Sequence, residues 1–543
     1  MCTDLCLGQR LSQFITQETA EKAGLINIRI NEIIENNFND IQIFKTFDPR
    51  INSLEYDSRS VKQGSLFFAL CGAHTDGSLF IKDAVKNGAA AVIHQGEITE
   101  KEKDIVYIKA KDARFSMSAV SAAFYQHPSR RLRVTGVTGT EGKSTTVFLI
   151  FQLLTLLGKK TGFISTVQHC TGGGVLENTE HQTTPEAPVV QRLLREMADN
   201  GCEYAVVESS SHGLSAKTNR LGDIDFFCAV LTNVTHEHLE FHGTWEQYRY
   251  DKANLFRALE KYPVKEESKM PFGVINADDN SAQYFKKAAN AKTFTYSPAG
   301  RDGDIILEMI ESGIRGNWYS VFIPSLNERI NIRDSLPGAY NCANVLASLL
   351  AVSGLTGLSF KETALHIKDL KPVRGRMTTI LKEQPFDVVV DYAHTPSSFK
   401  AVFPPLRERK NAEGKKIISL FGSAGERDTQ KRPQQGKIAA KYSDIIVLTD
   451  EDPRTENPMD ILEQIEAGVT AENEGTVFKR GENLFLIPDR RKAIRKALSL
   501  AGEGDIVILL GKGHENSIIY KDNAIPFDEI TETGKALAEM GFN

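Results

Sequence analysis

The chain has 543 residues, too many for one compact core, and a length of this kind predicts about three domains. The net charge of -5 argues against a large basic surface for nucleic acid. The 7 cysteines form no close Cys-x-x-Cys pair, which argues against a disulfide framework or a zinc site and indicates a reducing compartment. Residues 1–17 lack the regions of a signal peptide, and no long apolar run occurs, so we expect a cytoplasmic protein without membrane insertion.

Two α/β blocks are expected first, at residues 1–130 and 131–372. The expected elements of the first block are strands at 65–70 and 89–93 and a helix at 81–87. Those of the second are strands at 132–137, 204–207 and 226–231 and a helix at 145–157 that ends before Gly158. Strands that alternate with helices predict a mostly parallel sheet covered by helices.

The third block, residues 373–543, is expected to carry short strands that each run into a polar or glycine-rich turn. The strands are expected at 388–390, 417–421, 445–448 and 506–510, and the turns at 391–394, 422–427, 450–454 and 511–515. Ligands bind at the carboxyl ends of the strands in an open parallel sheet, so these turns predict one composite site. The alternative is a set of unrelated charged surface loops.

A phosphate-binding loop is predicted at residues 136–145, Gly-Val-Thr-Gly-Thr-Glu-Gly-Lys-Ser-Thr, between a strand and a helix. Gly139 and Gly142 let backbone N–H groups turn toward a phosphate, and the helix N-terminus adds a favourable dipole. Lys143 can neutralise terminal phosphates, and the Ser144 hydroxyl can bind magnesium. The first glycine stands one place away from the general pattern, so the loop favours an ATPase-like site without specifying the reaction. A purely structural turn is the alternative.

Glu208, at the end of a predicted strand, is a natural magnesium ligand beside such a loop. Several ligand-type side chains follow in residues 235–242, Thr-His-Glu-His-Leu-Glu-Phe-His. Their spacing matches no common zinc pattern, so ordinary polar contacts are the preferred interpretation for His236 and His242.

Taken together, these segments resemble the Mur ligase family, in order and across all three blocks. The motifs that carry the resemblance lie at 57–59, 139–144, 183–185, 208–212, 238–252, 276–279, 375–376, 391–396, 431–433, 452–454 and 511–515. Within the family, the chain is most similar to the members that add the third residue of the peptidoglycan stem peptide. The implied fold is α/β in three domains: a UDP-binding domain, a P-loop ATPase-like domain and a C-terminal Rossmann-like domain. An N-terminal extension ahead of the first motif has no assignment.

The resemblance implies an ATP-dependent acid–amino-acid ligase that works through an acyl phosphate. Its substrates would be UDP-N-acetylmuramoyl-L-alanyl-D-glutamate and a diamino acid, its cofactors ATP and Mg²⁺, and its form a monomer. Folylpolyglutamate synthetase is an alternative within the superfamily, but Asp57-Ser-Arg59 is typical of a uridine-nucleotide domain. A catalytically inactive nucleotide-binding protein is another alternative, which the intact Lys143, Glu208, His238 and Lys252 argue against.

The resemblance also implies a role for each matching residue. The residues implied in catalysis are Lys143, Glu208, His238 and Lys252, the last matching a carbamylated lysine, and the metal ligands are Ser144, Glu208, His238 and Lys252. Those implied for ATP are Gly139, Thr140, Glu141, Gly142, Lys143, Ser144, Thr145, Asn276, Arg376, Asp391 and His394. Those implied for the UDP substrate are Tyr56, Ser58, Gln182, Thr183, Thr184, Ser210 and Arg220. Those implied for the amino acid are Arg427, Glu451, Asp452, Arg454, Gly511 and Glu515.

The chain departs from the family pattern at a few positions. Glu141 stands where Asn is usual, Ser397 where Asp is commoner, and the stretch from His212 to Arg220 is longer. The amino-acid motif, usually Asp-Asn-Pro-Arg, reads Glu-Asp-Pro-Arg at residues 451–454.

The change to Asp452 bears on which amino acid is added. An ionised Asp only accepts hydrogen bonds, so it would attract a distal ammonium and repel a distal carboxylate. Arg454 matches the partner of the distal carboxylate of meso-diaminopimelate, but it could pair internally with Asp452 instead. This charge pattern favours L-lysine or L-ornithine over meso-diaminopimelate. The alternative is that Asp452 makes only a turn contact before Pro453.

Overall fold

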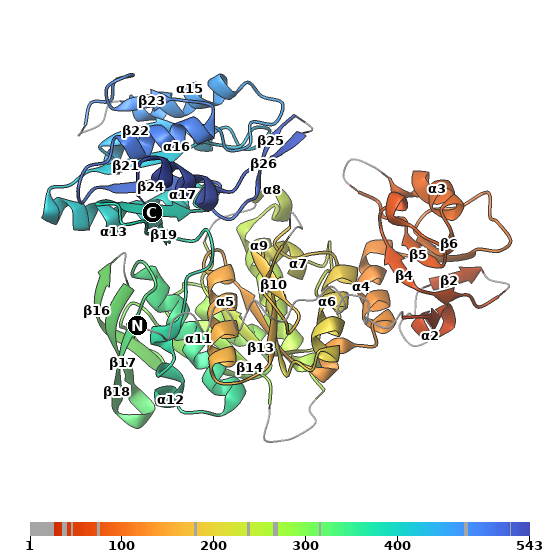
Figure 1. Ribbon diagram of the computed structural model, residues 1–543. Helices are drawn as coiled ribbons and strands as arrows, with labels where there is room; N and C mark the ends of the chain where they lie inside the picture. Colours follow the sequence, from red (N-terminus) through yellow and green to blue (C-terminus); the bar gives the residue numbers. More distant parts are fainter. Residues whose placement is uncertain are drawn as a thin grey trace. The chain divides into compact units, whose positions relative to one another are not determined.

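The computed structural model describes residues 26–34, 41–44, 47–72, 76–178, 182–235, 239–263, 270–313, 316–471, 476–521 and 523–542 (Figure 1). The chain divides into two compact units. Unit 1 comprises Met1–Glu308, Val321–Ile330 and Ala343–Ile367, and unit 2 comprises Met309–Ser320, Asn331–Cys342 and Lys368–Asn543. Within the part of the chain that the structure describes, no helix is long and apolar enough to cross a membrane.

Unit 1 begins with a five-stranded sheet in the order β2-β7-β6-β5-β4. These strands are β2 (Ile41–Phe44), β4 (Ser53–Glu55), β5 (Ser65–Phe68), β6 (Ala89–His94) and β7 (Val106–Ala110). Successive residues of β5 point to opposite faces of the sheet. Leu66 and Phe68 therefore pack against α2 (Ile30–Ile34) and α4 (Ala113–Phe124), while Phe67 packs against α3 (Ile81–Lys86) on the other face.

A second sheet of unit 1 has a parallel centre in the order β9-β12-β8-β13-β14-β15. Its strands are β8 (Arg133–Thr138), β9 (Thr161–Ile164), β12 (Tyr204–Glu208), β13 (Phe226–Leu231), β14 (Phe272–Asn276) and β15 (Lys292–Ser297). Its helices include α5 (Lys143–Leu156), α6 (Ala187–Asp199), α9 (Trp245–Arg257) and α11 (Tyr340–Thr356). Every residue of β13 is buried, as expected for a strand covered on both faces.

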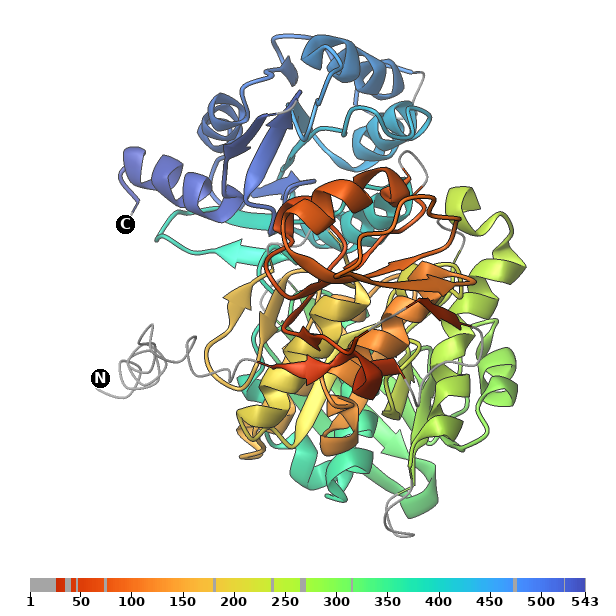
Figure 2. The same ribbon diagram turned by 90° about the vertical axis from the view of Figure 1, so that its right-hand side faces the viewer.

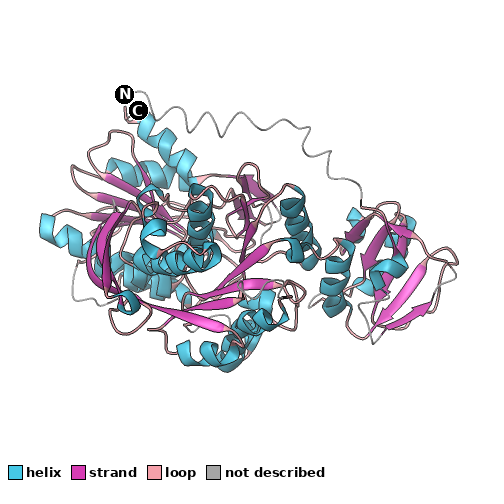
Figure 3. Ribbon diagram, turned by 90° about the horizontal axis from the view of Figure 1, so that it is seen from below, coloured by secondary structure: helices cyan, strands magenta, loops and turns pink. Residues whose placement is uncertain are grey.

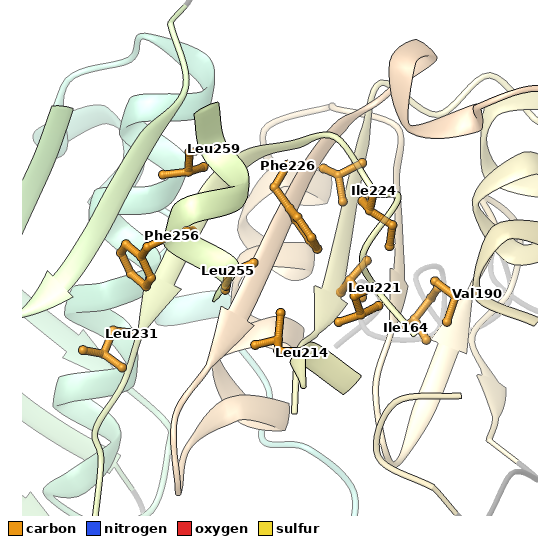
Figure 4. Packing of buried hydrophobic residues seen from close by; sticks show 14 of the residues in the cluster. Ile164, Val190, Leu214, Leu221, Ile224, Phe226, Leu231, Leu255, Phe256 and Leu259 are labelled. Atoms are coloured by element: carbon orange, nitrogen blue, oxygen red, sulfur yellow. The ribbon is translucent and has the colours of Figure 1, made fainter. Parts of the chain in front are cut away.

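Side chains from these strands and helices form one apolar core, shown from close by in Figure 4. Phe226 of β13 packs there with Leu255 and Phe256 of α9 and Val190 of α6. The core also includes Val134 of β8 and Ala205 and Val207 of β12, so it packs against the two strands that precede the candidate site. Three further strands, β16 (Ile305–Gly313), β17 (Gly316–Ile323) and β18 (Glu328–Asp334), have residues in both units.

Unit 2 is built on a sheet in the order β19-β20-β24-β21-β22-β23, parallel except for β19. Its strands have the cyan to blue colours in Figure 2. The strands are β19 (Thr378–Ile380), β20 (Asp387–Asp391), β21 (Ile417–Phe421), β22 (Ile445–Leu448), β23 (Leu484–Leu486) and β24 (Ile506–Leu510). Val389 faces one apolar core and Val388 faces another, because alternate residues of β20 point to opposite sides. The first core includes α13 (Pro396–Glu413), α14 (Lys431–Tyr442) and α15 (Pro458–Val469), and the second α16 (Arg490–Ser499) and α17 (Glu529–Glu539).

The predicted strands of all three sheets are confirmed. Four have the predicted bounds and the others differ by one or two residues. Strands are magenta in Figure 3. The helix predicted at 145–157 begins earlier, at Lys143, and that boundary was wrong. Gly142 has a left-handed φ of 79° and acts as the helix N-cap, so the loop closes two residues sooner than predicted. Lys143 and Ser144 therefore lie in the first helical turn.

Candidate functional site

The loop between β8 and α5 has the backbone of a phosphate cradle. Gly139 has a φ of 152°, and a Cβ there would lie 1.8 Å from Oγ1 of Thr232. A Cβ on Gly142 would lie 2.5 Å from Oδ1 of Asn344 on α11. Both positions therefore require glycine, for space and for conformation. The N-terminus of α5 follows directly, and helix N-termini favour anions.

Two polar side chains of α5 point back toward this loop. Nζ of Lys143 donates to the carbonyl oxygen of Thr140 at 2.7 Å. Oγ of Ser144 donates to Oε1 of Glu208, at the end of β12, at 2.9 Å, and the backbone N–H of Thr166 donates to Oε2 of Glu208 at 2.8 Å. Ser144 and Glu208 are both buried, so the structure brings together an oxygen-rich pair that the sequence placed 64 residues apart.

Lys252 approaches the same loop from α9. It is only 1% exposed, and its Nζ donates to the carbonyl oxygen of Gly139 at 2.5 Å. The ammonium also lies 4.4 Å from the ring centroid of Tyr248, whose hydroxyl is 3.1 Å from Oγ1 of Thr140. Lys143 and Lys252 thus both contact the loop, and Glu208 contacts Ser144 in the first turn of the helix that follows it. His238 lies outside the described residues.

A buried polar chain fixes α9 beside this loop. Nδ1 of His242 lies 2.8 Å from Oδ2 of Asp251, and its Nε2 lies 3.0 Å from Oγ of Ser211. Asp251 also accepts from the Gln247 side chain at 2.9 Å. The polar contacts expected for His242 are therefore present. They connect Asp251, which precedes Lys252, with Ser211, which follows Ser210. His236 lies outside the described residues.

The residues predicted for the muramyl-peptide end lie around Thr184. Its hydroxyl donates to the carbonyl oxygen of Glu208 at 2.9 Å and lies 2.9 Å from Oγ of Ser210. Nη1 of Arg220 donates to the carbonyl oxygen of Thr184 at 2.8 Å, and Nη2 donates to Glu186 at 2.9 Å. Although the stretch from His212 to Arg220 is longer than in the family pattern, the Arg220 guanidinium therefore still contacts Thr184.

The other residues predicted to bind the UDP substrate differ in their exposure to solvent. Gln182 is exposed and Thr183 is half-buried. In the first sheet of unit 1, the Tyr56 ring is exposed, whereas Ser58 is buried and its carbonyl oxygen accepts from Asn87 at 2.9 Å. Asp57 caps this short turn and pairs with Arg59, so the motif at 57–59 has a structural role of its own.

In unit 2, Asp391 and His394 lie at the carboxyl end of β20. Asp391 accepts backbone N–H bonds from Met377 and Ala393, both at 2.7 Å. Burial raises the pKa of Asp391, and the Arg376 guanidinium opposes that rise. Arg376 lies 4.7 Å from the ring centroid of Tyr392, whose carbonyl oxygen is 2.9 Å from Nδ1 of His394. Asn276, also predicted for ATP, lies in unit 1 and donates to the carbonyl oxygen of Thr232.

The turns after β22 and β24 bring charged side chains together. Nζ of Lys512 donates to Oδ1 of Asp452 at 2.9 Å and to Oε2 of Glu515 at 2.5 Å. Lys512 is 1% exposed, and burial lowers its pKa, but Glu515 and Asp452 outweigh burial and raise the pKa above its ordinary value. The lysine is therefore an ammonium, and it compensates both carboxylates.

Arg454 does not use Asp452 as its partner, so the internal pair suggested by the sequence was wrong. Asp452 is occupied by Lys512 instead, and among the described residues Nε of Arg454 is buried without a hydrogen-bond partner. The backbone of Arg454 has a φ of 53° and pairs with Ile519 and Lys521. Arg427, in the turn after β21, is exposed.

A buried arginine holds the backbone of these turns. Arg490 donates to the carbonyl oxygen of Asp450 at 2.9 Å and to that of Leu510 at 2.7 Å, so it joins the ends of β22 and β24. Its guanidinium also makes a two-point pair with Glu529 at 2.7 and 3.0 Å, and both side chains are fully buried. The spacing of the two turns therefore depends on one interior cation.

We expect Arg490→Met to lower the free energy of unfolding of unit 2 by about 3–5 kcal/mol, because it leaves the Glu529 carboxylate buried without its cation. Urea unfolding followed by hydrogen exchange in β24 measures the loss. The matched control is Arg491→Met, because the Arg491 side chain is 43% exposed, lies 3.5 Å from Glu532 and donates to the carbonyl oxygen of Pro526 at 2.8 Å, without a buried ion pair. Equal effects of the two substitutions would contradict the importance of the buried pair.

Three family models match the chain. They are the Mur ligase family catalytic domain at residues 50–131, the Mur ligase middle domain at 137–352 and the Mur ligase glutamate ligase domain at 375–513. A UDP-N-acetylmuramyl-tripeptide synthetase of Treponema denticola is 51% identical over 507 residues, which cover 90% of this chain and 94% of the relative. The chain belongs to the Mur ligase family.

Further comparisons agree with this assignment. A UDP-N-acetylmuramyl-tripeptide synthetase of Treponema pallidum is 46% identical over 505 residues, covering 88% of this chain and 92% of the relative. A solved UDP-N-acetylmuramoyl-L-alanyl-D-glutamate–2,6-diaminopimelate ligase has 28% identity and a TM-score of 0.62, covering 95% of this chain and 100% of its own. The predicted three-domain α/β fold and the prediction of an ATP-dependent ligase are thereby confirmed for this Mur ligase.

Sequence reasoning overlooked several residues of this Mur ligase that hold the site together. Lys512 lies inside the motif at 511–515, and an explicit count of charges in that motif could have identified it. Asn344, whose amide oxygen approaches both Gly142 and Thr146, gave no such signal, since it is one polar residue in an apolar helix. Arg490 gave none either, because Arg491 and Lys492 follow it and the run looks solvated.

Proposed function

We propose that this Mur ligase joins the D-glutamate γ-carboxylate of UDP-N-acetylmuramoyl-L-alanyl-D-glutamate to a diamino acid, as a monomer in the cytoplasm, during peptidoglycan precursor synthesis. The single observation that carries the proposal is that Lys143, Glu208 and Lys252 all contact the glycine loop or the first turn of α5. The names of the Treponema relatives support the choice of substrate. The domains proposed for this work are residues 1–130 for the UDP end, 131–372 for ATP and 373–543 for the amino acid.

The chemistry begins with activation of the carboxylate. The γ-phosphoryl group of ATP moves to the D-glutamate γ-carboxylate and gives an acyl phosphate. Lys143 in the first turn of α5 would balance charge on the transferring group, together with the N–H groups of the loop. The neutral amine of the amino acid then attacks the carbonyl carbon, and phosphate leaves as the amide forms.

Magnesium fits the donor set beside the loop. Ser144 and Glu208 supply a hydroxyl and a carboxylate 2.9 Å apart, and oxygen ligands are those that Mg²⁺ prefers. They would hold the ion together with His238 and Lys252, and the ion supplies positive charge to the phosphate oxygens. Lys252 serves this role as a carbamate: its uncharged amine adds CO₂ and loses a proton, which turns a cation into an anion. Its burial beside the loop supports that assignment.

The binding of the other substrates follows the predicted residues. Thr183, Thr184, Ser210 and Arg220 would line the muramyl peptide with Gln182, and Tyr56 and Ser58 the uridine end. Gly139, Thr140, Glu141, Gly142 and Thr145 would complete the ATP site with Asn276, Arg376, Asp391 and His394. Arg427 would hold the α-carboxylate of the amino acid, beside Glu451, Asp452, Arg454, Gly511 and Glu515.

L-Lysine or L-ornithine is the proposed amino acid. Around the turns after β22 and β24, the carboxylates of Glu451, Asp452 and Glu515 outnumber the cations of Lys512 and Arg454. A site with excess negative charge favours a side chain that ends in a single ammonium over one that ends in an ammonium and a carboxylate. meso-Diaminopimelate is the second candidate, favoured by the unpartnered Nε of Arg454 among the described residues.

A competition tests both the reaction and the amino acid. The enzyme is incubated with ATP, magnesium, the muramyl-dipeptide nucleotide and equal amounts of L-lysine, L-ornithine and meso-diaminopimelate, and mass spectrometry identifies the product. We expect a basic amino acid in the dominant tripeptide. A dominant diaminopimelate product would refute the charge argument, and the absence of any amide product would refute the proposed reaction.

A further inference from the structure

The loop between β8 and α5 is held by the segment that leaves β13, residues 232–235. A Cβ on Gly139 would lie 3.1 Å from both the backbone nitrogen and the carbonyl oxygen of Asn233, so the glycine lets the two backbones approach each other. The N–H of Thr140 donates to the carbonyl oxygen of Asn233 at 2.8 Å, and the N–H of Thr235 donates to Oγ1 of Thr140 at 2.9 Å. The conformation of the loop therefore depends on β13 as well as on its own strand.

The side chain of Asn233 contacts both backbone groups of Glu141. Its Oδ1 accepts from the N–H of Glu141 at 3.0 Å, and its Nδ2 donates to the carbonyl oxygen of Glu141 at 3.2 Å. The Thr232 hydroxyl donates to the same carbonyl oxygen at 2.6 Å. Because an amide side chain carries both an acceptor and a donor, it can fix a backbone in this way whatever side chain that residue has. Asn233 therefore holds the residue directly before Gly142, where the loop turns into α5.

The segment around Asn233 is in turn held from β14, the next strand of the sheet. Nδ2 of Asn276, at the end of β14, donates to the carbonyl oxygen of Thr232 at 2.8 Å. Oδ2 of Asp279 accepts from the N–H of Val234 at 2.7 Å. The peptide groups on both sides of Asn233 are thus fixed, so its side chain is presented to the loop from a rigid backbone.

We propose that Asn233 is a positioning residue for phosphoryl transfer: it holds the backbone of Glu141 so that the N–H groups at the start of α5 are directed at the phosphates of ATP. This inference rests on the proposed function, because it concerns the loop that would hold ATP in that reaction. Positioning matters because a displacement of about 1 Å can lower a rate about 100-fold. The contacts of Asn233 described above are all with the protein, so its effect on ATP is indirect.

The test measures catalysis and nucleotide binding separately. Asn233→Ala is expected to lower kcat for amide formation about 10- to 100-fold at saturating ATP, magnesium and substrates. The affinity for Mg·ADP, measured by calorimetry, is expected to fall by a smaller factor, because the positioning acts mainly on the transferring group. Asn233→Gln keeps the amide one methylene further out and is expected to have a kcat between those of the wild type and the alanine variant. It also provides the measurement if Asn233→Ala does not fold.

Asn483→Ala is the matched control, because Asn483 makes the same kind of two-point contact in the turn before β23. Its Oδ1 accepts from the N–H of Lys479 at 2.8 Å, and its Nδ2 donates to the carbonyl oxygen of Val477 at 3.1 Å. This variant is expected to keep the wild-type kcat, and thermal unfolding is recorded for every variant.

The results separate the inference from the function on which it rests. A kcat in Asn233→Ala no lower than in Asn483→Ala overturns the inference while the ligase function stands. A loss of kcat that is matched by an equal loss of affinity for Mg·ADP also overturns it, since Asn233 would then serve nucleotide binding alone. A wild-type enzyme that forms no amide defeats the proposed function, and the inference with it.

Discussion

Lys143→Ala is expected to lower kcat about 100- to 1,000-fold, the range for removing one preorganised group that stabilises transition-state charge. Lys143 lies in the first turn of α5, and its Nζ reaches back to the carbonyl oxygen of Thr140 in the loop. In the proposed site, this cation would balance charge on the terminal phosphates of ATP. Release of inorganic phosphate, followed with all substrates saturating, measures the effect.

Lys143→Arg provides the control for charge. It keeps the cation but changes its shape, so we expect activity between that of the wild type and that of Lys143→Ala. A KM for ATP that rises while kcat stays constant would mean that Lys143 binds ground state and transition state equally. An alanine variant with wild-type kcat would remove Lys143 from the phosphate site altogether.

Lys252→Ala is expected to reduce ligation to about 1% of wild type or less, because the proposed metal-holding carbamate on α9 would be lost. The substitution also removes a contact to Gly139, so folding must be checked by thermal unfolding alongside product formation. Short carboxylates added to the assay are expected to restore part of the activity, since they can supply the missing anion in the space that the side chain vacates.

Lys261→Ala is the matched control for this substitution, because Lys261 is an exposed lysine shortly after the same helix. It is expected to have wild-type activity and to show no response to added carboxylates. If Lys252→Ala retains near wild-type turnover, the carbamate assignment is wrong. Loss of activity without any rescue, together with an unfolded variant, would instead assign Lys252 to the packing of α9.

The strands of this protein were predictable because their physical signals are local. Residues 226–231 and 506–510 are apolar runs that end at polar or glycine turns, and β13 and β24 have those bounds in the structure. The start of α5 was less predictable, because the sequence around Lys143 and Ser144 is compatible with either a loop or a helix. The left-handed conformation of Gly142 decided it, and only the folded backbone fixes that dihedral angle.

The composition of the candidate site was predictable, but its charge partners were not. Motif matches named Asp452 and Glu515, but their common partner Lys512 is identified only when the fold brings the turns after β22 and β24 together. Asp452 and Lys512 are 60 residues apart in the sequence. The same holds for Ser144 and Glu208. The sequence motifs suggested that both bind magnesium, but they did not predict the hydrogen bond between them. The motifs in the sequence therefore predict which residue types form the site. Which buried charges pair with one another depends on how the strands and turns are arranged in the fold.

The Arg490 interaction bears on how substrate choice can evolve in such an enzyme. Its guanidinium donates to backbone carbonyl oxygens of the two turns. These hydrogen bonds do not depend on which side chains the turns carry. A neighbouring position such as Glu451 can then mutate while the backbone of the two turns keeps its shape. A substitution at such a position could therefore change which amino acid the proposed site accepts while the backbone of the two turns stays in place.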